Sequence, residues 1–235
     1  GSTRTGKRIM ELAAQKVTRV HLELGGKAPF VVFADADIEA AARGAVVGAY
    51  INTGQDCTAA TRILVERSCY DDFLAAFTQL SQQIRLGSPQ VESTDMGPLI
   101  SAEQRQRVHG FVERAKAEGI TTPLAGGIPE DRGFFYQPTI FCQAPTHSEI
   151  MQEEVFGPVV VVNSIDSEEE AIAVANDVKY GLAASVWTKD CAKAWRVASA
   201  LQFGTVWIND HLPLASEMPH GGFKESGFGK DLSRY

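Results

Sequence analysis

The sequence contains 235 residues, of which 44% are hydrophobic and 22% are charged, as in an ordinary globular protein. With 22 Lys and Arg against 29 Asp and Glu, the formal net charge is -7. No run of basic residues is present, so neither a nucleic acid nor a membrane surface is expected as a partner. The apolar runs are much shorter than the roughly 20 residues that span a bilayer, and we expect a cytoplasmic protein.

The predicted helices and strands alternate along the chain. Strands are expected at residues 28–33, 60–66, 158–165, 183–188 and 204–210, where short apolar runs occur. Helices are expected at residues 37–52, 70–84, 101–117, 167–178 and 191–201, several of them after an Asp or Ser cap. Residues 121–146 are expected to form short strands and turns. This alternation predicts an α/β fold with a largely parallel sheet flanked by helices.

The two ends of the sequence differ from this pattern. A Gly-containing turn, "GSTRTG", leads into a helix without a preceding strand. Residues 221–235 are rich in glycine and are expected to form a loop that docks to nothing. We therefore expect the chain to be a piece of something longer.

The cysteines and histidines carry no metal-binding pattern. The four cysteines (Cys57, Cys69, Cys142 and Cys191) are far apart in the sequence, without a CxxC or Cys/His spacing. Reduced thiols are expected, without a disulfide framework or a metal site. The five histidines also lack metal-ligand spacing and are interpreted as structural or solvated.

Two residues stand out as candidates for catalysis. Cys57 lies in a polar turn between a helical run and a strand, although a lone cysteine is often only a small buried hydrophobe. Asp56 beside it would disfavour the thiolate if the two side chains approach, whereas backbone N–H groups or a cation would favour it. Glu23 lies between two leucines, a setting that disfavours ionisation and suits a general base, but a solvent-facing Glu is equally compatible. The spacing allows Glu23 and Cys57 to meet at one end of the sheet.

Four segments carry a family resemblance. In order, "LELGGKAPFVVF", "NTGQDCTAATRILVE", "EEVFGPVV" and "GGFKESGFGKD" resemble the signature segments of the NAD(P)-dependent aldehyde dehydrogenase superfamily. The resemblance implies that Cys57 is the nucleophile and that Glu23 activates the water that hydrolyses a thioester. It also implies that residues 1–25 end a coenzyme-binding domain, residues 26–225 form the catalytic domain, and residues 226–235 begin a truncated C-terminal segment.

The same resemblance implies a nicotinamide dinucleotide cofactor, NAD, with NADP left open. In the family pattern, Ser2 and Gly6 belong to the pyrophosphate turn, and Leu24 presents its carbonyl to the carboxamide beside Gly25. Glu154 would bind the ribose hydroxyls, and Phe156 would pack near the nicotinamide. The parent protein is expected to be a homo-oligomer, a dimer or a tetramer.

The expected substrate is a small aldehyde. "GQDCTA" and "SEMPHGG" resemble the aminoaldehyde branch, in particular γ-aminobutyraldehyde dehydrogenases, with betaine aldehyde and succinic semialdehyde left open. An ammonium group would favour acidic or aromatic neighbours. The candidates for the substrate pocket are Asp56, Trp207, Asp210, Glu217 and His220.

Two alternatives to the dehydrogenase remain open from the sequence. With the cofactor half absent, Cys57 could act as a cofactor-independent thiol esterase. The chain could also be a non-catalytic fragment that associates with itself.

Overall fold

The structure, a computed structural model, describes residues 1–130 and 133–234. Its helices are α1 (Thr3–Ala14), α2 (Ile38–Tyr50), α3 (Tyr70–Gln82), α4 (Ala102–Ala117), α5 (Glu149–Gln152), α6 (Glu168–Asn176) and α7 (Cys191–Ala200), with the short 3₁₀ segments η1 (Ile51–Gly54) and η2 (Arg67–Cys69). Its strands are β1 (Leu22–Glu23), β2 (Pro29–Val32), β3 (Arg62–Glu66), β4 (Thr121–Leu124), β5 (Thr139–Cys142), β6 (Val159–Ile165), β7 (Tyr180–Gly181), β8 (Ala183–Trp187), β9 (Thr205–Ile208), β10 (Phe223–Lys224) and β11 (Gly227–Phe228).

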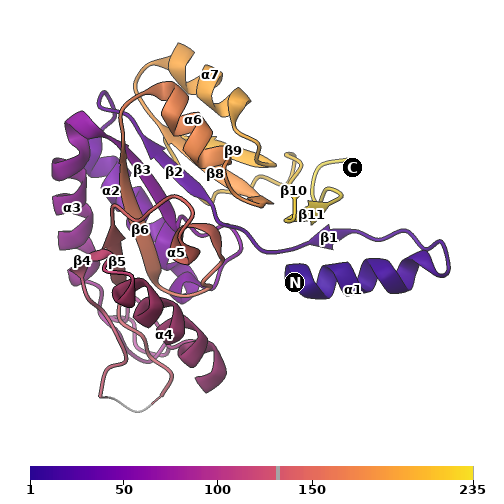
Figure 1. Ribbon diagram of the computed structural model, residues 1–235, viewed down its shortest axis with the longest axis horizontal. Coiled ribbons are helices and arrows are strands. Elements are labelled where there is room, and N and C mark those ends of the chain that lie inside the picture. Colours follow the sequence, from indigo (N-terminus) through magenta and orange to yellow (C-terminus); the bar gives the residue numbers. More distant parts are fainter. Residues whose placement is uncertain (131–132, 235) are drawn as a thin grey trace.

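A seven-stranded sheet in the order β4-β5-β6-β3-β2-β8-β9 forms the centre of the protein (Figure 1). Its strands pair in parallel except at one edge, where β4 runs antiparallel to β5. The predicted α/β fold with a largely parallel sheet is therefore confirmed, and the predicted element bounds lie within a few residues of those observed.

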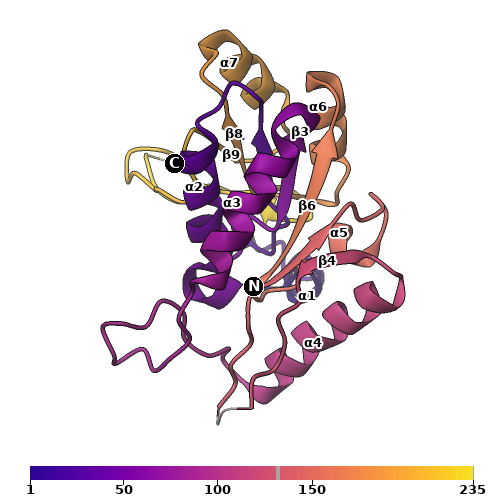
Figure 2. The same ribbon diagram turned by 90° about the vertical axis from the view of Figure 1, so that its left-hand side faces the viewer.

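Helices cover both faces of this sheet (Figures 1 and 2). Side chains on β2 alternate between the faces, as pleated strands require. Phe30 and Val32 belong to the core beneath α2 and α3, whereas Val31 and Phe33 belong to the core beneath α6 and α7. The fully apolar sequence of β2 thus follows from burial on both sides, which is typical of parallel sheets.

The helix starts follow from their capping residues. The side chains of Asp37, Ser101, Ser167 and Asp190 each accept a hydrogen bond from a backbone N–H in the first turn of the helix that follows. Such caps satisfy donors that have no partner within the helix. Ser2 does the same for α1 through the N–H of Thr5.

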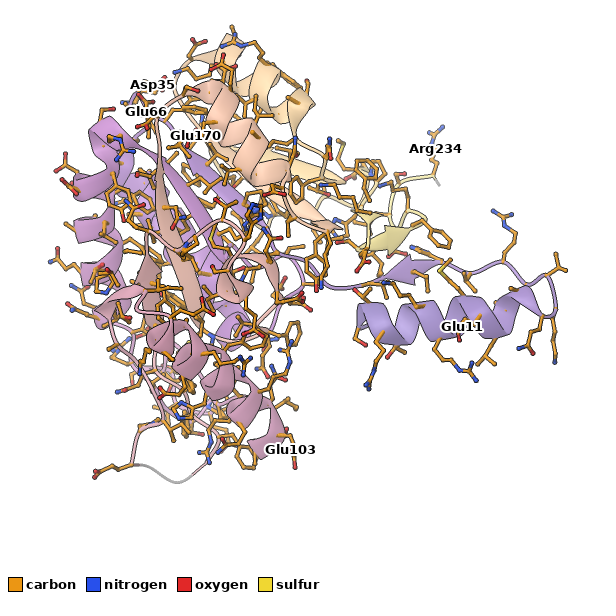
Figure 3. The ribbon with its side chains drawn as sticks, viewed as in Figure 1. Glu11, Asp35, Glu66, Glu103, Glu170 and Arg234 are labelled. Carbon is orange, nitrogen blue, oxygen red and sulfur yellow. The ribbon has the colours of Figure 1, made fainter. Side chains whose placement is uncertain are left out.

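At the carboxyl ends of the strands, carboxylate side chains accept hydrogen bonds from neighbouring loops. Figure 3 shows Asp35, Glu66 and Glu170 near one another at that end of the sheet. Asp35 accepts hydrogen bonds from the hydroxyl of Thr188 (2.7 Å) and from a neighbouring backbone N–H, and Glu66 accepts one from the N–H of Ala34 (2.9 Å). Glu170 accepts a hydrogen bond from the N–H of Asp166 (2.6 Å), so all three side chains hold loops.

The glycine-rich end of the chain is docked, and the prediction that it docks to nothing is wrong. β10 pairs with β7, and β11 pairs with β1, so that Glu23 lies opposite Gly227. Gly227 has a φ of 108°, and a Cβ there would overlap the carbonyl oxygen of Leu22. The prediction failed because two-residue strands have no periodicity, and their partners lie far away in sequence. Figure 1 shows α1 and β1 standing to one side of the main sheet, next to β11.

No helix among residues 1–130 and 133–234 has the length and apolar character needed to cross a membrane.

Candidate active site

The Cys57 loop lies at the amino edge of the parallel strands, immediately before β3. The chain turns sharply after α2, because Asn52, Thr53 and Gly54 all adopt left-handed conformations, with φ of 49°, 61° and 68°. This turn ends α2 two residues before the predicted end of that helix. A Cβ on Gly54 would overlap the carbonyl oxygen of Gly157, so the Cys57 loop packs directly on the loop that precedes β6.

The carboxylate of Asp56 holds the turn that carries the thiol. Its Oδ1 atom accepts hydrogen bonds from the backbone N–H of Thr58 (2.7 Å) and from the Thr58 hydroxyl (2.6 Å). Burial raises the pKa of the Cys57 thiol to about 11, and the charges of Asp56, Glu23 and Glu154 add to this effect. The backbone N–H of Cys57 donates to no backbone carbonyl among the described residues, and it opposes part of the rise in the pKa of the thiol.

Glu154 lies against the Gly25-Gly26 segment. Its Oε1 atom accepts a hydrogen bond from the N–H of Gly26 (3.0 Å), and burial raises the pKa of its carboxyl group. A Cβ on Gly25 would overlap Oε2 of Glu154. Gly25 therefore lets the backbone approach the carboxylate closely, whereas a Cβ on Gly26 would overlap the carbonyl oxygen of Cys57.

Two side chains of α4 donate hydrogen bonds to the backbone of the loop that contains Glu154. Gln104 donates to the carbonyl oxygen of Phe156 (2.7 Å), and Arg107 donates to the carbonyl oxygens of Glu154 (2.6 Å) and Val155. Phe156 has a φ of 59°, a strained conformation for an aromatic residue. Sequence reasoning missed Gln104 and Arg107, because polar residues on an amphipathic helix give no signal that distinguishes them from solvated ones.

A cavity of about 580 Å³ joins these elements. Of the predicted residues, its lining includes Ser2, Gly25, Cys57, Glu154 and Phe156, together with Asp56. Two further predicted residues, Gly6 and Leu24, are buried and do not line this cavity. A Cβ on Gly6 would be 2.6 Å from the side chain of Leu24, so this pair fixes how α1 packs on the Gly25 segment.

Glu23 does not belong to the lining of that cavity. It faces His220, with 3.9 Å between its Oε2 and the imidazole Nε2, and its Oε1 is buried without a hydrogen-bond partner among the described residues. Its charge is nevertheless one of those that raise the pKa of Cys57. The structure therefore brings Glu23 within electrostatic reach of the thiol without making the two side chains neighbours in one cavity.

The other candidates for the substrate pocket are divided. Trp207 and His220 line a second cavity of about 330 Å³ with Met218 and other apolar residues. Asp210 and Glu217 are exposed and line neither cavity, and Asp210 accepts a hydrogen bond from the N–H of the residue that follows it (2.8 Å).

Two further buried residues, Lys27 and His211, lie next to the site. The Nζ of Lys27 is buried without a hydrogen-bond partner among the described residues, and burial lowers its pKa to about 7, helped by the nearby Arg62. His211 lies beneath the Cys57 loop, and burial lowers its pKa to about 4. A lysine at the start of an apolar strand was a usable signal in the sequence, whereas nothing local indicated His211.

The α/β sheet therefore places a thiol, a buried carboxylate and a helix N-terminus around one cavity, so a possible nucleophile and a possible anion-binding group lie together. The chain belongs to the aldehyde dehydrogenase family, because the sequence model of that family matches residues 1–235. The predicted family resemblance is therefore confirmed.

Relatives and solved structures agree with this assignment. The chain is 47% identical to a betaine aldehyde dehydrogenase of Bacillus subtilis over all of this chain and 49% of that protein. It is 43% identical to a betaine aldehyde dehydrogenase of Brucella anthropi, over 98% of this chain and 48% of the relative. The structure matches a betaine aldehyde dehydrogenase of Staphylococcus aureus, solved in complex with NAD⁺, with a TM-score of 0.96 and 46% identity over 100% of this chain and 47% of that one. The chain thus spans about half the length of the relatives it matches.

Proposed function

We propose that this chain is part of an enzyme that oxidises an aldehyde to a carboxylate, with Cys57 as the nucleophile. The observation that carries the proposal is the cavity that Cys57 shares with Glu154 and with the N-terminus of α1, in a chain of the aldehyde dehydrogenase family.

The residues around the cavity fit NAD. Backbone N–H groups at the start of α1 suit a phosphate, and the buried carboxylate of Glu154 suits the hydroxyls of a ribose. Gly25 allows the close approach, and the ring of Phe156 offers an apolar surface. When bound, the nicotinamide supplies the acceptor for hydride. The Staphylococcus aureus relative solved with NAD⁺ supports this cofactor.

Cys57 attacks the aldehyde carbonyl as a thiolate. Because its thiol has a pKa of about 11, the reaction depends on the small fraction that has lost its proton. The backbone N–H of Cys57 donates to the oxygen that becomes negative during the attack. With a nicotinamide bound, the hydride lost from the thiohemiacetal would pass to that ring, and a thioester would remain on Cys57.

Glu23 then activates the water that hydrolyses the thioester. Its Oε1 atom is buried without a hydrogen-bond partner among the described residues, so a water that enters beside it would find an acceptor for its proton there. The negative charge of Glu23 near Cys57 has a cost, because it disfavours the thiolate in the first step.

We propose an aldehyde that carries an amino or quaternary ammonium group as the substrate, such as γ-aminobutyraldehyde or betaine aldehyde. Two relatives are named for betaine aldehyde. Trp207 in the second cavity supplies an aromatic surface of the kind that attracts such cations. Asp56 is less suited to this role than the sequence suggested, because Thr58 already occupies its Oδ1 atom.

We also propose the domain division expected from the sequence, with residues 1–25 belonging to a coenzyme domain, residues 26–225 to the catalytic domain and residues 226–235 to a following segment. The position of α1 and β1 beside the main sheet supports it. The ion pair of Lys7 with Glu225 (2.8 Å) joins the first segment to the end of the catalytic domain, and the pairing of β1 with β11 joins it to the last segment.

Acylation by p-nitrophenyl acetate needs no cofactor. It therefore distinguishes, in this chain, the proposed role of Cys57 from that of Glu23. The unsubstituted chain should give a burst of nitrophenolate followed by slow turnover. Cys57→Ser should abolish the burst, whereas Glu23→Gln should retain the burst and lose the turnover. Cys191→Ser, which removes an exposed cysteine, should change neither. A full burst from the Cys57→Ser chain would overturn the assignment of the nucleophile.

NADH formation tests the complete reaction, in this chain and in any longer protein that contains it. γ-Aminobutyraldehyde and betaine aldehyde should give a higher kcat/KM than the anionic succinic semialdehyde. Equal values for all three aldehydes would contradict the proposed substrate class, and NADH formation that survives Cys57→Ala would contradict the mechanism.

A further inference from the structure

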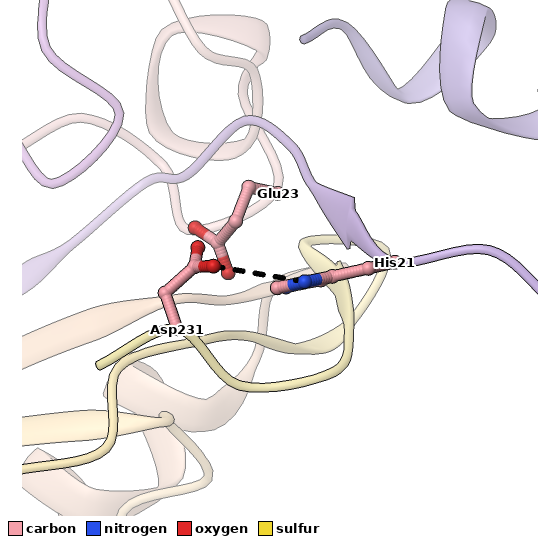
Figure 4. A group of neighbouring side chains, drawn as sticks. All are labelled: His21, Glu23 and Asp231. Carbon is pink, nitrogen blue, oxygen red and sulfur yellow. Dashed lines mark ion pairs between the residues drawn. The ribbon is translucent and has the colours of Figure 1, made fainter. Parts of the chain in front are cut away.

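Three side chains from opposite ends of the sequence converge beside β1. One ligand atom from each of His21, Glu23 and Asp231 lies within 4.8 Å of the other two, and the Nδ1 of His21 is 3.6 Å from Oδ1 of Asp231. Figure 4 shows the imidazole and the two carboxylates pointing toward one another. We propose that His21, Glu23 and Asp231 bind a divalent transition-metal ion of the Zn²⁺ class.

The backbone positions of these residues are fixed by strand pairing. Glu23 pairs with Gly227 across the β1–β11 ladder. Asp231 exchanges two backbone hydrogen bonds with His220, of 2.7 and 2.9 Å. His21 packs against Gly229, where a Cβ would overlap its imidazole ring. The three ligands are therefore held near one another before any ion arrives, which lowers the entropy that binding costs.

The donor set favours zinc, cobalt or nickel over calcium and magnesium. An imidazole nitrogen with two carboxylate oxygens is a ligand combination that Zn²⁺ accepts, whereas Ca²⁺ and Mg²⁺ prefer oxygen ligands alone. Three protein ligands leave a fourth position for water. The buried Oε1 of Glu23, without a hydrogen-bond partner among the described residues, is an oxygen that a cation would satisfy.

The geometry permits closure around an ion. Bonds of about 2.0–2.2 Å in a tetrahedral site place donor atoms roughly 3.4 Å apart. The His21–Asp231 pair is already at 3.6 Å, so the remaining approach falls to Glu23. The side chains of His21 and Asp231 are 40% and 53% exposed, which leaves them free to adjust and gives an ion a path from solvent.

Local spacing in the sequence could not predict this site, because Asp231 lies at the far end of the chain from His21 and Glu23. A bound ion would also occupy the carboxylate that the proposed function uses as a base. That consequence rests on the proposed function, whereas the binding itself does not.

Titration with Zn²⁺ and Co²⁺ tests the site, by calorimetry and by the visible absorption of Co²⁺. All chains should carry Cys57→Ser, and the absence of a thiolate-to-cobalt band in the near ultraviolet excludes the remaining cysteines as ligands. One ion per chain is expected. His21→Gln and Asp231→Asn should each weaken binding at least tenfold.

His147 and Asp177 provide the matched control. Their Nδ1–Oδ2 separation is also 3.6 Å, on an exposed surface, but they are not part of the three-ligand group. His147→Gln should leave the affinity unchanged, and far-ultraviolet circular dichroism checks that every variant is folded. Absence of binding, or equal affinity in the His21→Gln and His147→Gln chains, would overturn the proposal. Either result is obtained without turnover, so it is independent of whether the chain oxidises aldehydes.

Discussion

The imidazole of His211 supports the loop that carries Cys57, with its Nε2 atom 2.8 Å from the carbonyl oxygen of Thr58. Its Nδ1 atom is 3.0 Å from the hydroxyl of Ser185. In the neutral ring, Nε2–H donates to the carbonyl and Nδ1 accepts from the hydroxyl, so both nitrogens are satisfied. A protonated ring would place a donor on Nδ1 and a charge in an apolar environment.

Acid should therefore destabilise the protein through His211. Burial lowers its pKa to about 4 from 6.5. Between these values the unfolded chain binds more protons than the folded one, so the free energy of unfolding falls as the pH is lowered from 6.5 toward 4, by at most about 1.4 kcal/mol per pH unit. Urea unfolding at several pH values measures this fall in the free energy of unfolding. His211→Gln should reduce this slope and the exposed His147→Gln should not; equal slopes in all three chains would refute the prediction.

The Cys57 thiol should react slowly at neutral pH. Because its pKa is about 11, the rate of alkylation by iodoacetamide should rise about tenfold per pH unit between pH 7 and 10. Asp56→Asn keeps an oxygen for Thr58 and removes a charge, so it should increase the rate at pH 8 by roughly three- to tenfold. Mass spectrometry of the Cys57 peptide follows the reaction. A rate that is independent of pH would show that the thiol is already ionised.

Lys27 should make the stability of the protein increase with pH above neutrality. Its pKa is about 7 in the folded chain and 10.5 in the reference state, so unfolding takes up protons between these values and stability rises with pH there. Lys27→Met should remove this rise and stabilise the chain at pH 6 by about 1–3 kcal/mol. Chemical denaturation at pH 6 and pH 9 compares the two chains. A Lys27→Met chain that is less stable at pH 6 would indicate that the ammonium group has a partner.

Gly54→Ala should destabilise the protein for two reasons, the left-handed backbone and the lack of room for a Cβ. Gly119 and Gly97 allow these two effects to be measured separately. Gly54 has a φ of 68° and no room for a Cβ, Gly119 has a φ of 76° with open space, and Gly97 has open space without a left-handed backbone. Gly119→Ala should cost about 1–2 kcal/mol from the backbone alone. Gly54→Ala should cost more, and Gly97→Ala should have little effect. Thermal unfolding orders the three variants, and a Gly54→Ala chain as stable as Gly119→Ala would disprove the overlap with Gly157.

The elements predicted best are those with strong periodicity and a capping residue. α3 shows this, since Phe73 and Phe77 were recognisable as one apolar stripe and are both fully buried. The buried strand β2 was equally clear, because an apolar run between turn signals has few alternatives. In both cases local residues determine the structure.

Other features depend on contacts that no local pattern contains. The direction of the Glu23 side chain follows from the pairing of a two-residue strand with residues at the other end of the sequence. The anchoring of Phe156 by Gln104 depends on how α4 packs. The position of Cys57 before a strand was predictable, whereas its separation from the Glu23 side chain was not.

The β1–β11 ladder also sets an order of events during synthesis. Glu23 emerges from the ribosome long before Gly227, its partner in the ladder, by roughly 10–40 s at typical rates of translation. During that interval the nascent chain carries the Cys57 thiol without the strand that pairs beside Glu23. The β1–β11 ladder is therefore assembled late, only after β11 has been made.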